Sequence, residues 1–156
     1  MPKTESVWDY PRPPAVEPSD ERITVVLGGR TIVDTTDSVR VLETSHPPVY
    51  YVPRSAVADG VLSTADGASS CEYKGRAKYL TLSAGGRTAA GAAWYYPTPN
   101  PGFEALRDRI AIYPGRMDEV RVAGEVVTPQ EGDFYGGWIT SRVTGPFKGA
   151  PGTLGW

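Results

Sequence analysis

Short runs of alternating apolar and polar residues fill the middle of the chain, and a period of two is typical of half-buried β-strands. We predict strands over residues 23–27, 31–33, 39–42, 49–52, 78–82, 88–96, 110–113 and 120–122. Glycine pairs at 28–29 and 85–86 separate adjacent runs and predict two tight hairpins. Many short strands joined by glycine turns favour a mainly β protein built from antiparallel sheets.

One segment follows a helical period instead. Phe103, Leu106 and Ile110 recur at helical spacing behind Pro101, and proline suits the first position of a helix. The pattern therefore predicts one short helix over residues 101–109.

The two ends differ in composition from the middle. Residues 1–20 form a proline-rich arm, in which extended polyproline II backbone is favoured. Residues 21–127 hold the predicted strands and form the core domain. Residues 128–156 form a C-terminal arm rich in glycine, proline and aromatic residues. We expect both arms to be extended.

Tryptophans in both arms predict that the arms pack on the core. Each tryptophan has about 150–250 Å² of mostly apolar surface, which is costly to leave in water. We therefore expect Trp8 and at least one of Trp138 and Trp156 to be largely buried. The arms could also supply a homo-oligomer contact.

The composition narrows the class of protein. At 156 residues the chain has the length of one domain, and its formal net charge of -2 argues against a nucleic-acid partner. The sequence contains no apolar run long enough to span a membrane and no secretory signal pattern. A single cysteine cannot form an internal disulfide, so we expect a cytoplasmic protein.

The stretch around the single cysteine holds the most chemistry. Cys71 and Lys74 stand three positions apart and Gly75 follows, a spacing that resembles a metal knuckle whose second thiol is replaced by an amine. Such a turn points both side chains the same way, and the glycine relieves the backbone where φ is positive. One cysteine and one histidine cannot complete a zinc shell, so we predict no metal site.

Two interpretations of this pair stay open. A nearby ammonium lowers the pKa of a thiol, and a desolvated lysine can act as a base or form an imine. Alternatively, Cys71 is a buried structural residue beside a surface lysine. Glu43, between a predicted strand and the following turn, is either an inward-facing functional acid or an ordinary cross-strand partner.

Aromatic and basic residues nearby could complete a ligand site. In the strand ending near residue 96, Trp94 and Tyr96 share one face, and either could stack on a planar ligand or belong to an aromatic core. Lys74, Arg76 and Lys78 have the same parity and form either an anion-binding stripe or a solvated face. His46 is the only histidine, and we interpret it as a turn residue in preference to a member of a catalytic triad.

Five motifs occur in the order shown by a known family: VYYVP at 49–53, CEYKGRA at 71–77, AAWYYP at 92–97, IAIYP at 110–114 and MDEV at 117–120. On these motifs, roughly residues 23–124 resemble the small bacterial family of domain of unknown function 427, also called a nucleotidyltransferase-like domain. The tail at 134–156 resembles a longer actinobacterial branch.

The resemblance implies a β-tent-like fold, as in cereblon-type domains, in which antiparallel sheets lean on each other around a ligand cavity. Those relatives hold zinc between two Cys-x-x-Cys knuckles, and this chain keeps only the knuckle spacing at Cys71 to Gly75. A phosphoryl-transfer site would need paired carboxylates and a phosphate-binding loop, and the sequence shows neither.

We therefore expect a small-molecule-binding domain with a pocket near the Cys71–Lys74 turn and a planar or anionic ligand. The predicted ligand-binding residues are Tyr73, Lys74, Arg76, Trp94 and Tyr96. No cofactor is expected. The alternatives are a small enzyme that uses Lys74 with Cys71 or Glu43, and a structural or interaction module.

Overall fold

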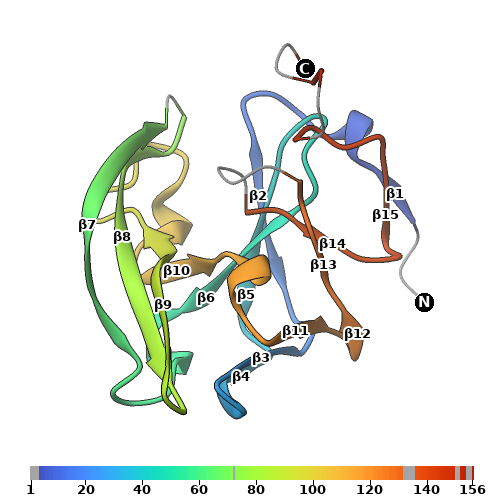
Figure 1. The fold of residues 1–156 in the computed structure, drawn as a ribbon. Helices are drawn as coiled ribbons and strands as arrows, with labels where there is room; N and C mark the ends of the chain where they lie inside the picture. The colour runs from blue at the N-terminus through green and yellow to red at the C-terminus, as the bar shows by residue number, and fades with distance from the viewer. Residues whose placement is uncertain (1–3, 72, 132–135, 150–151, 154–155) are drawn as a thin grey trace.

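The computed structural model describes residues 4–71, 73–131, 136–149, 152–153 and 156, and β-strands dominate them (Figure 1). The helical segments of these residues are short 3₁₀ turns at Val7–Asp9, Arg54–Ala56, Glu104–Leu106 and Pro114–Arg116. No described helix is long and apolar enough to cross a bilayer. The prediction of a mainly β fold is confirmed.

A seven-stranded antiparallel sheet forms the larger part of the molecule, with the strand order β2-β5-β6-β10-β9-β8-β7. Its strands are Ala15–Ser19 (β2), Ser38–Leu42 (β5), Val49–Pro53 (β6), Leu62–Cys71 (β7), Gly75–Ala84 (β8), Arg87–Tyr95 (β9) and Arg109–Ile112 (β10). In Figure 1 the sheet runs from β2 in the centre to β7 at the left.

Three smaller sheets complete the fold. A four-stranded antiparallel sheet has the order β12-β11-β3-β4, with strands Ile23–Leu27 (β3), Arg30–Thr35 (β4), Glu119–Val122 (β11) and Glu125–Val126 (β12). Thr128–Pro129 (β13) pairs with Trp138–Ile139 (β14). Glu5–Ser6 (β1) pairs in parallel with Val143–Thr144 (β15), so a segment near the start of the chain lies beside one near its end.

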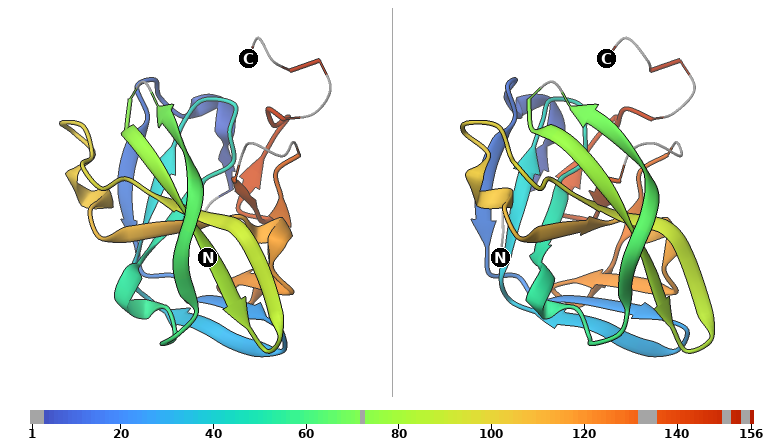
Figure 2. Two further views of the ribbon diagram at one scale, coloured as in Figure 1. Left: turned by 60° about the vertical axis from the view of Figure 1, so that its left-hand side comes forward. Right: turned by 90° about the vertical axis from the view of Figure 1, so that its left-hand side faces the viewer.

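The main core lies between the two larger sheets. Alternate residues Ile23, Val25 and Leu27 of β3 are fully buried there, as the period of two predicts. From the seven-stranded sheet, Tyr50 and Leu82 join the same cluster. Figures 1 and 2 show the four-stranded sheet lying across one end of the seven-stranded sheet.

The opposite face of the seven-stranded sheet carries a second buried cluster. It includes Tyr51, Trp94 and Tyr96, whereas Tyr50 and Tyr95 pack against the main core. Consecutive strand residues point to opposite faces of a sheet, which explains why Trp94 and Tyr96 lie together. This second cluster contains the candidate site.

Both glycine hairpins are confirmed: Gly28 and Gly29 join β3 to β4, and Gly85 and Gly86 join β8 to β9. The predicted helix at 101–109 is wrong. Only Glu104–Leu106 forms a 3₁₀ turn, because Arg107 is extended and Asp108 has a φ of 60°, so the chain leaves the helical region and enters β10.

The arms differ from the prediction in two respects. Residues 15–19 of the proline-rich arm form β2 at an edge of the large sheet, where Pro18 needs no ladder donor. The burial of Trp8 was predicted wrongly: it is 41% exposed, its ring contacts Trp156 and its Nε1 donates to the Pro146 carbonyl. Trp138 is buried as predicted.

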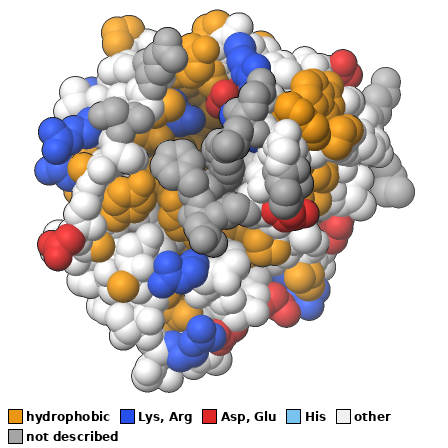
Figure 3. Space-filling view, turned by 45° about the horizontal axis from the view of Figure 1, so that its top comes forward, with side chains coloured by type: hydrophobic (Ala, Val, Ile, Leu, Met, Phe, Trp, Pro, Cys, Tyr) orange, Lys and Arg blue, Asp and Glu red, His pale blue; other side chains and the backbone are white. Residues whose placement is uncertain are grey.

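The face at the top of Figure 1 is partly apolar. Figure 3 shows hydrophobic side chains reaching the surface there in several patches, beside lysine and arginine side chains.

The two glycine hairpins touch backbone to backbone, and this contact yields a stability prediction. A Cβ on Gly28, whose φ is 60°, would lie 2.0 Å from the Ala84 carbonyl oxygen. We expect Gly28→Ala to lower the free energy of unfolding by about 2 kcal/mol, from the left-handed backbone plus overpacking. Gly29→Ala is the matched control, because Gly29 has a φ of 75° and open space around it. We expect Gly29→Ala to lower the free energy of unfolding by about 1 kcal/mol. Urea unfolding of both variants tests this, and equal losses would mean that the contact is unimportant.

Candidate functional site

A cavity of about 260 Å³ opens on the second face of the seven-stranded sheet. Residues of β5 to β9 form its floor and walls, and the other side is contributed by Glu43, His46, Pro47, Gln130, Gly136 and Lys148. Pockets for drug-sized ligands measure about 300–1,000 Å³, so this cavity suits a small molecule.

Aromatic side chains form one wall of the cavity. The Trp94 ring lies 4.6 Å from the Tyr113 ring and 6.3 Å from that of Tyr51, centroid to centroid. Tyr96 follows, with its ring 6.3 Å from that of Tyr51. Trp94 Nε1 donates to the Tyr51 hydroxyl at 3.3 Å. These separations are typical of aromatic pairs, so the wall is a packed cluster that also faces the cavity.

Burial keeps the phenols of this wall protonated. It raises the pKa of Tyr51 and Tyr96 well above the ordinary value of 10.0 and that of Tyr113 to about 12. Burial is the largest cause in each case because it disfavours the phenolate. The wall therefore offers neutral hydroxyl groups at physiological pH.

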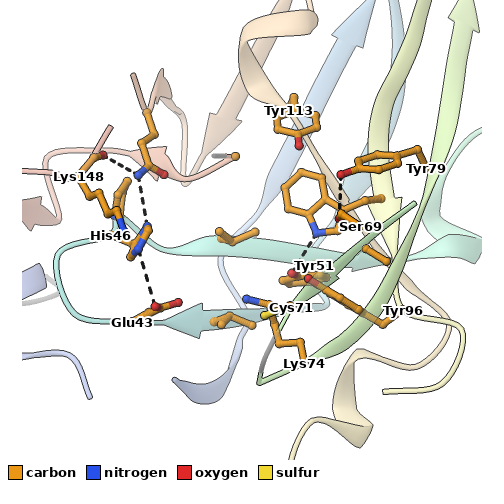
Figure 4. A pocket seen from close by; sticks show the side chains of 17 residues that line it. Glu43, His46, Tyr51, Ser69, Cys71, Lys74, Tyr79, Tyr96, Tyr113 and Lys148 are labelled. Carbon is orange, nitrogen blue, oxygen red and sulfur yellow. Dashed lines mark hydrogen bonds and ion pairs between the residues drawn. The ribbon is translucent and has the colours of Figure 1, made fainter. Parts of the chain in front are cut away.

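The other end of the cavity is polar (Figure 4). Gln130, which is 5% exposed, accepts a hydrogen bond from the Gly137 amide at Oε1 and donates from Nε2 to the Lys148 carbonyl at 2.6 Å. The same Nε2 lies 3.4 Å from Nδ1 of His46. His46 Nε2 in turn lies 3.8 Å from a Glu43 carboxylate oxygen.

These contacts define the protonation state of His46. Because Gln130 Oε1 accepts from a backbone amide, its Nε2 must donate, so His46 Nδ1 accepts and the ring proton sits on Nε2. Burial, followed by the positive charges of Lys148, Lys74 and Arg12, lowers the pKa of His46 to about 4. Glu43 favours the charged ring, but these effects outweigh it. His46 is therefore neutral at pH 7.

Both arms hold the loop that bears Glu43 and His46. The Ser45 amide donates to the Val7 carbonyl at 3.1 Å, and the Lys148 amide donates to the Ser45 carbonyl at 2.8 Å. Arg12 lies 3.6 Å from the Glu43 carboxylate and donates to the Thr44 carbonyl. The polar end of the cavity thus depends on segments far apart in the sequence.

The turn between β7 and β8 places Cys71 and Lys74 at the cavity. Cys71 and Gly75 are register partners, and the side chains of Cys71 and Lys74 both line the cavity, as the spacing predicts. Asn100 holds the turn, because its amide donates to the Lys74 carbonyl and its side chain to the Tyr73 carbonyl. Gly75 has a φ of 119°, which favours glycine.

The structure brings five of the seven sequence-predicted site residues to one cavity and leaves two outside. Glu43, Cys71, Lys74, Trp94 and Tyr96 line it. Tyr73 packs against the aromatic cluster but does not line the cavity. Arg76 is exposed and does not line it either, and Lys78 is also exposed. The basic stripe therefore contributes only Lys74, from the turn.

At the Glu43 end of the cavity, three polar residues were not predicted as site residues: His46, Gln130 and Lys148. His46 was interpreted as a turn residue, and Gln130 and Lys148 belong to an arm without any chemical motif. Gln130 and Lys148 reach the cavity through long-range contacts of this arm: the Trp138 ring stacks on Tyr50 of the interior strand β6 at 5.0 Å and anchors the arm there. No local sequence signal reveals such a contact.

Metal ligands do not gather in the part of the chain that the structure describes. No group of three or more histidine, cysteine, aspartate or glutamate side chains there could hold an ion. Cys71 is a free, half-buried thiol.

One comparison with known proteins gives a match. The model of a family described as a domain of unknown function, DUF427 or NTP_transf_9, matches residues 15–123. No curated protein matches the chain. The matched region supplies Glu43, His46, Cys71, Lys74 and the aromatic wall, whereas Gln130, Gly136 and Lys148 of the cavity lie outside it.

Proposed function

The chain belongs to the family of domain of unknown function 427, and we propose that it binds a small planar molecule with an anionic group in the cavity beside the Cys71–Lys74 turn. One observation supports this most strongly: the Lys74 side chain and an aromatic wall line the same cavity. Planar ligands pack on aromatic walls, and a lysine ammonium is a compact charge suited to an anion.

The charge of Lys74 is available to a ligand. No carboxylate of the described residues forms an ion pair with Lys74, whereas Glu43 lies close to Arg12 and His46. The positive charge of Lys74 also reaches His46 across the cavity. An anion placed between Lys74 and the aromatic wall would balance this charge.

A matched set of bicyclic probes tests the proposal: 2-naphthoate, its neutral analogue 2-naphthamide, and 2-naphthyl phosphate. We expect calorimetric titration to show tighter binding of an anionic probe than of the amide. Lys74→Met keeps the apolar stem and removes the charge. It should lower the affinity for the anionic probe roughly tenfold at low salt and by a smaller factor at high salt.

Lys78→Met is the matched control, because Lys78 is an exposed lysine of β8 that does not line the cavity. It should leave the affinity unchanged. Wild-type affinity for the anionic probe in Lys74→Met, or no preference for either anion over the amide, would contradict the proposal.

An enzyme that uses Lys74 with Cys71 or Glu43 is the alternative for the same cavity, because all three side chains line it. Glu43 lies at the His46 end, next to Arg12, and its role there would be that of a base or a charge partner. A natural ligand that is released chemically altered would favour catalysis, and one released unchanged would favour binding. A purely structural role is less well supported, because the cavity is lined by polar groups.

A further inference from the structure

The hydrogen bonds of the aromatic wall run in one direction. An indole Nε1 can only donate, so Tyr51 accepts from Trp94 at 3.3 Å. Tyr51 is fully buried, and its own proton needs an acceptor. Tyr96, whose ring lies 6.3 Å from that of Tyr51, is a further described side chain that interacts with the Tyr51 hydroxyl. Tyr51 therefore donates to Tyr96.

This direction leaves the proton of Tyr96 for the cavity. The Tyr96 oxygen receives the proton of Tyr51, so its own hydrogen must point elsewhere, and Tyr96 lines the cavity. Burial raises the pKa of Tyr96 well above 10.0, so the hydroxyl keeps this hydrogen at physiological pH. Tyr96 is thus a donor group and not only a stacking surface.

Lys74 lines the same cavity. Cys71, at the same turn, packs against the cluster that contains Tyr51 and Tyr96 and lines the cavity with them. Figure 4 shows Lys74, Cys71, Tyr51 and Tyr96 among the side chains that line this cavity. A cation and a neutral hydroxyl donor that face one space can bind a single oxyanion, and hydrogen bonds to an ionised acceptor are the stronger kind.

We infer that Tyr96 donates a hydrogen bond to the ligand oxyanion, carboxylate or phosphate, that Lys74 attracts. This inference rests on the proposed function. It makes Tyr96 a specificity-determining residue, because a ligand without an acceptor oxygen at this position would leave a buried hydroxyl unpaired.

The test compares tyrosine-to-phenylalanine variants of two adjacent residues. Tyr95 packs against the main core on the other face of the sheet and does not line the cavity. Tyr96→Phe should weaken binding of the tighter-binding anion, 2-naphthoate or 2-naphthyl phosphate, about tenfold or more. Tyr95→Phe should change the affinity for this anion less than about twofold, because no bond to the ligand is lost.

Two further readouts separate hydrogen bonding from charge and from folding. The loss of affinity for the anion in Tyr96→Phe should be similar at low and high salt, because the hydroxyl is neutral. The loss of affinity in Lys74→Met should become smaller as the salt concentration rises. The affinity ratio of the anion to 2-naphthamide does not depend on the folded fraction, and it should fall in Tyr96→Phe.

The outcomes are distinguishable. If neither anion binds the wild type better than the amide, the proposed function fails and this inference fails with it. If an anion binds with a dependence on Lys74 but Tyr96→Phe keeps the wild-type ratio, the inference about Tyr96 alone is overturned. A larger loss for the phosphate than for the carboxylate in Tyr96→Phe would support the inference and identify the oxyanion as phosphate-like.

Discussion

Replacing Arg40 with methionine is expected to lower the free energy of unfolding by about 3 kcal/mol. Arg40 is fully buried in β5, and its guanidinium donates to Glu5 at 2.9 Å and to Glu17 at 2.6 Å. Burial disfavours the charged guanidinium, but these hydrogen bonds outweigh it and raise the pKa of Arg40 above its ordinary value. Methionine would fill the space but leave both carboxylates without their buried partner.

The expected loss is moderate for a buried ion pair, because Glu5 and Glu17 are partly exposed and water can reach them once Arg40 is gone. Arg22→Met is the matched control. Arg22 makes a similar two-bond contact with Asp34, but the Arg22 side chain is 65% exposed. Arg22→Met should cost far less stability than Arg40→Met, because an exposed ion pair contributes little.

Urea unfolding at pH 7 measures both variants. The N-terminal segment should also become more sensitive to proteolysis in Arg40→Met, because Glu5 and Glu17 both lie in it. If the two arginine variants lose the same stability, burial of the ion pair has no special importance.

Acidification is expected to destabilise the protein through His46 before most carboxylates titrate. The pKa of His46 is about 4 in the folded protein, against 6.5 for an ordinary histidine. Between these values the unfolded chain binds one more proton than the folded chain, so the free energy of unfolding falls as the pH decreases. This pKa difference contributes roughly 3 kcal/mol to the free energy of unfolding at neutral pH, and the contribution is fully lost below about pH 4.

His46→Asn tests this linkage. The Asn Oδ1 can replace Nδ1 as acceptor for Gln130 without adding a titrating group. The variant should therefore show a flatter dependence of stability on pH between about 6.5 and 4, measured by urea unfolding at several pH values. Parallel curves for the wild type and the variant would show that His46 is not the group responsible.

The strands that sequence reasoning found are those whose side chains enter a core. In β3 the alternating Ile23, Val25 and Leu27 face the main core, so their period reports the sheet directly. The longest unpredicted strand, β7, is an edge strand with few large apolar residues. It is positioned by its pairing with β8, and a strand that gains its order from its partner leaves little trace in its own sequence.

The candidate site divides in the same way. Cys71, Lys74, Trp94 and Tyr96 lie on or beside paired strands, so parity and turn spacing were enough to place them together. Gln130 and Lys148 reach the cavity through tertiary contacts of an arm with the loop at 43–48, and no local pattern encodes such contacts. The prediction for Arg76 treated residues 74–78 as one regular strand. In the structure β8 begins only at Gly75, so Lys74 belongs to the turn and its side chain does not share the direction of Arg76.

The pairing of β1 with β15 has a consequence for protein synthesis. Trp8 and its acceptor Pro146 are 138 residues apart, and the parallel strand pair joins the same two regions. A ribosome adds about 5–20 residues per second, so the N-terminal strand waits roughly ten seconds for its partner to be translated. The seam between β1 and β15 can therefore close only after residues 143–144 have been synthesised, when every strand of the two larger sheets has already been added to the chain.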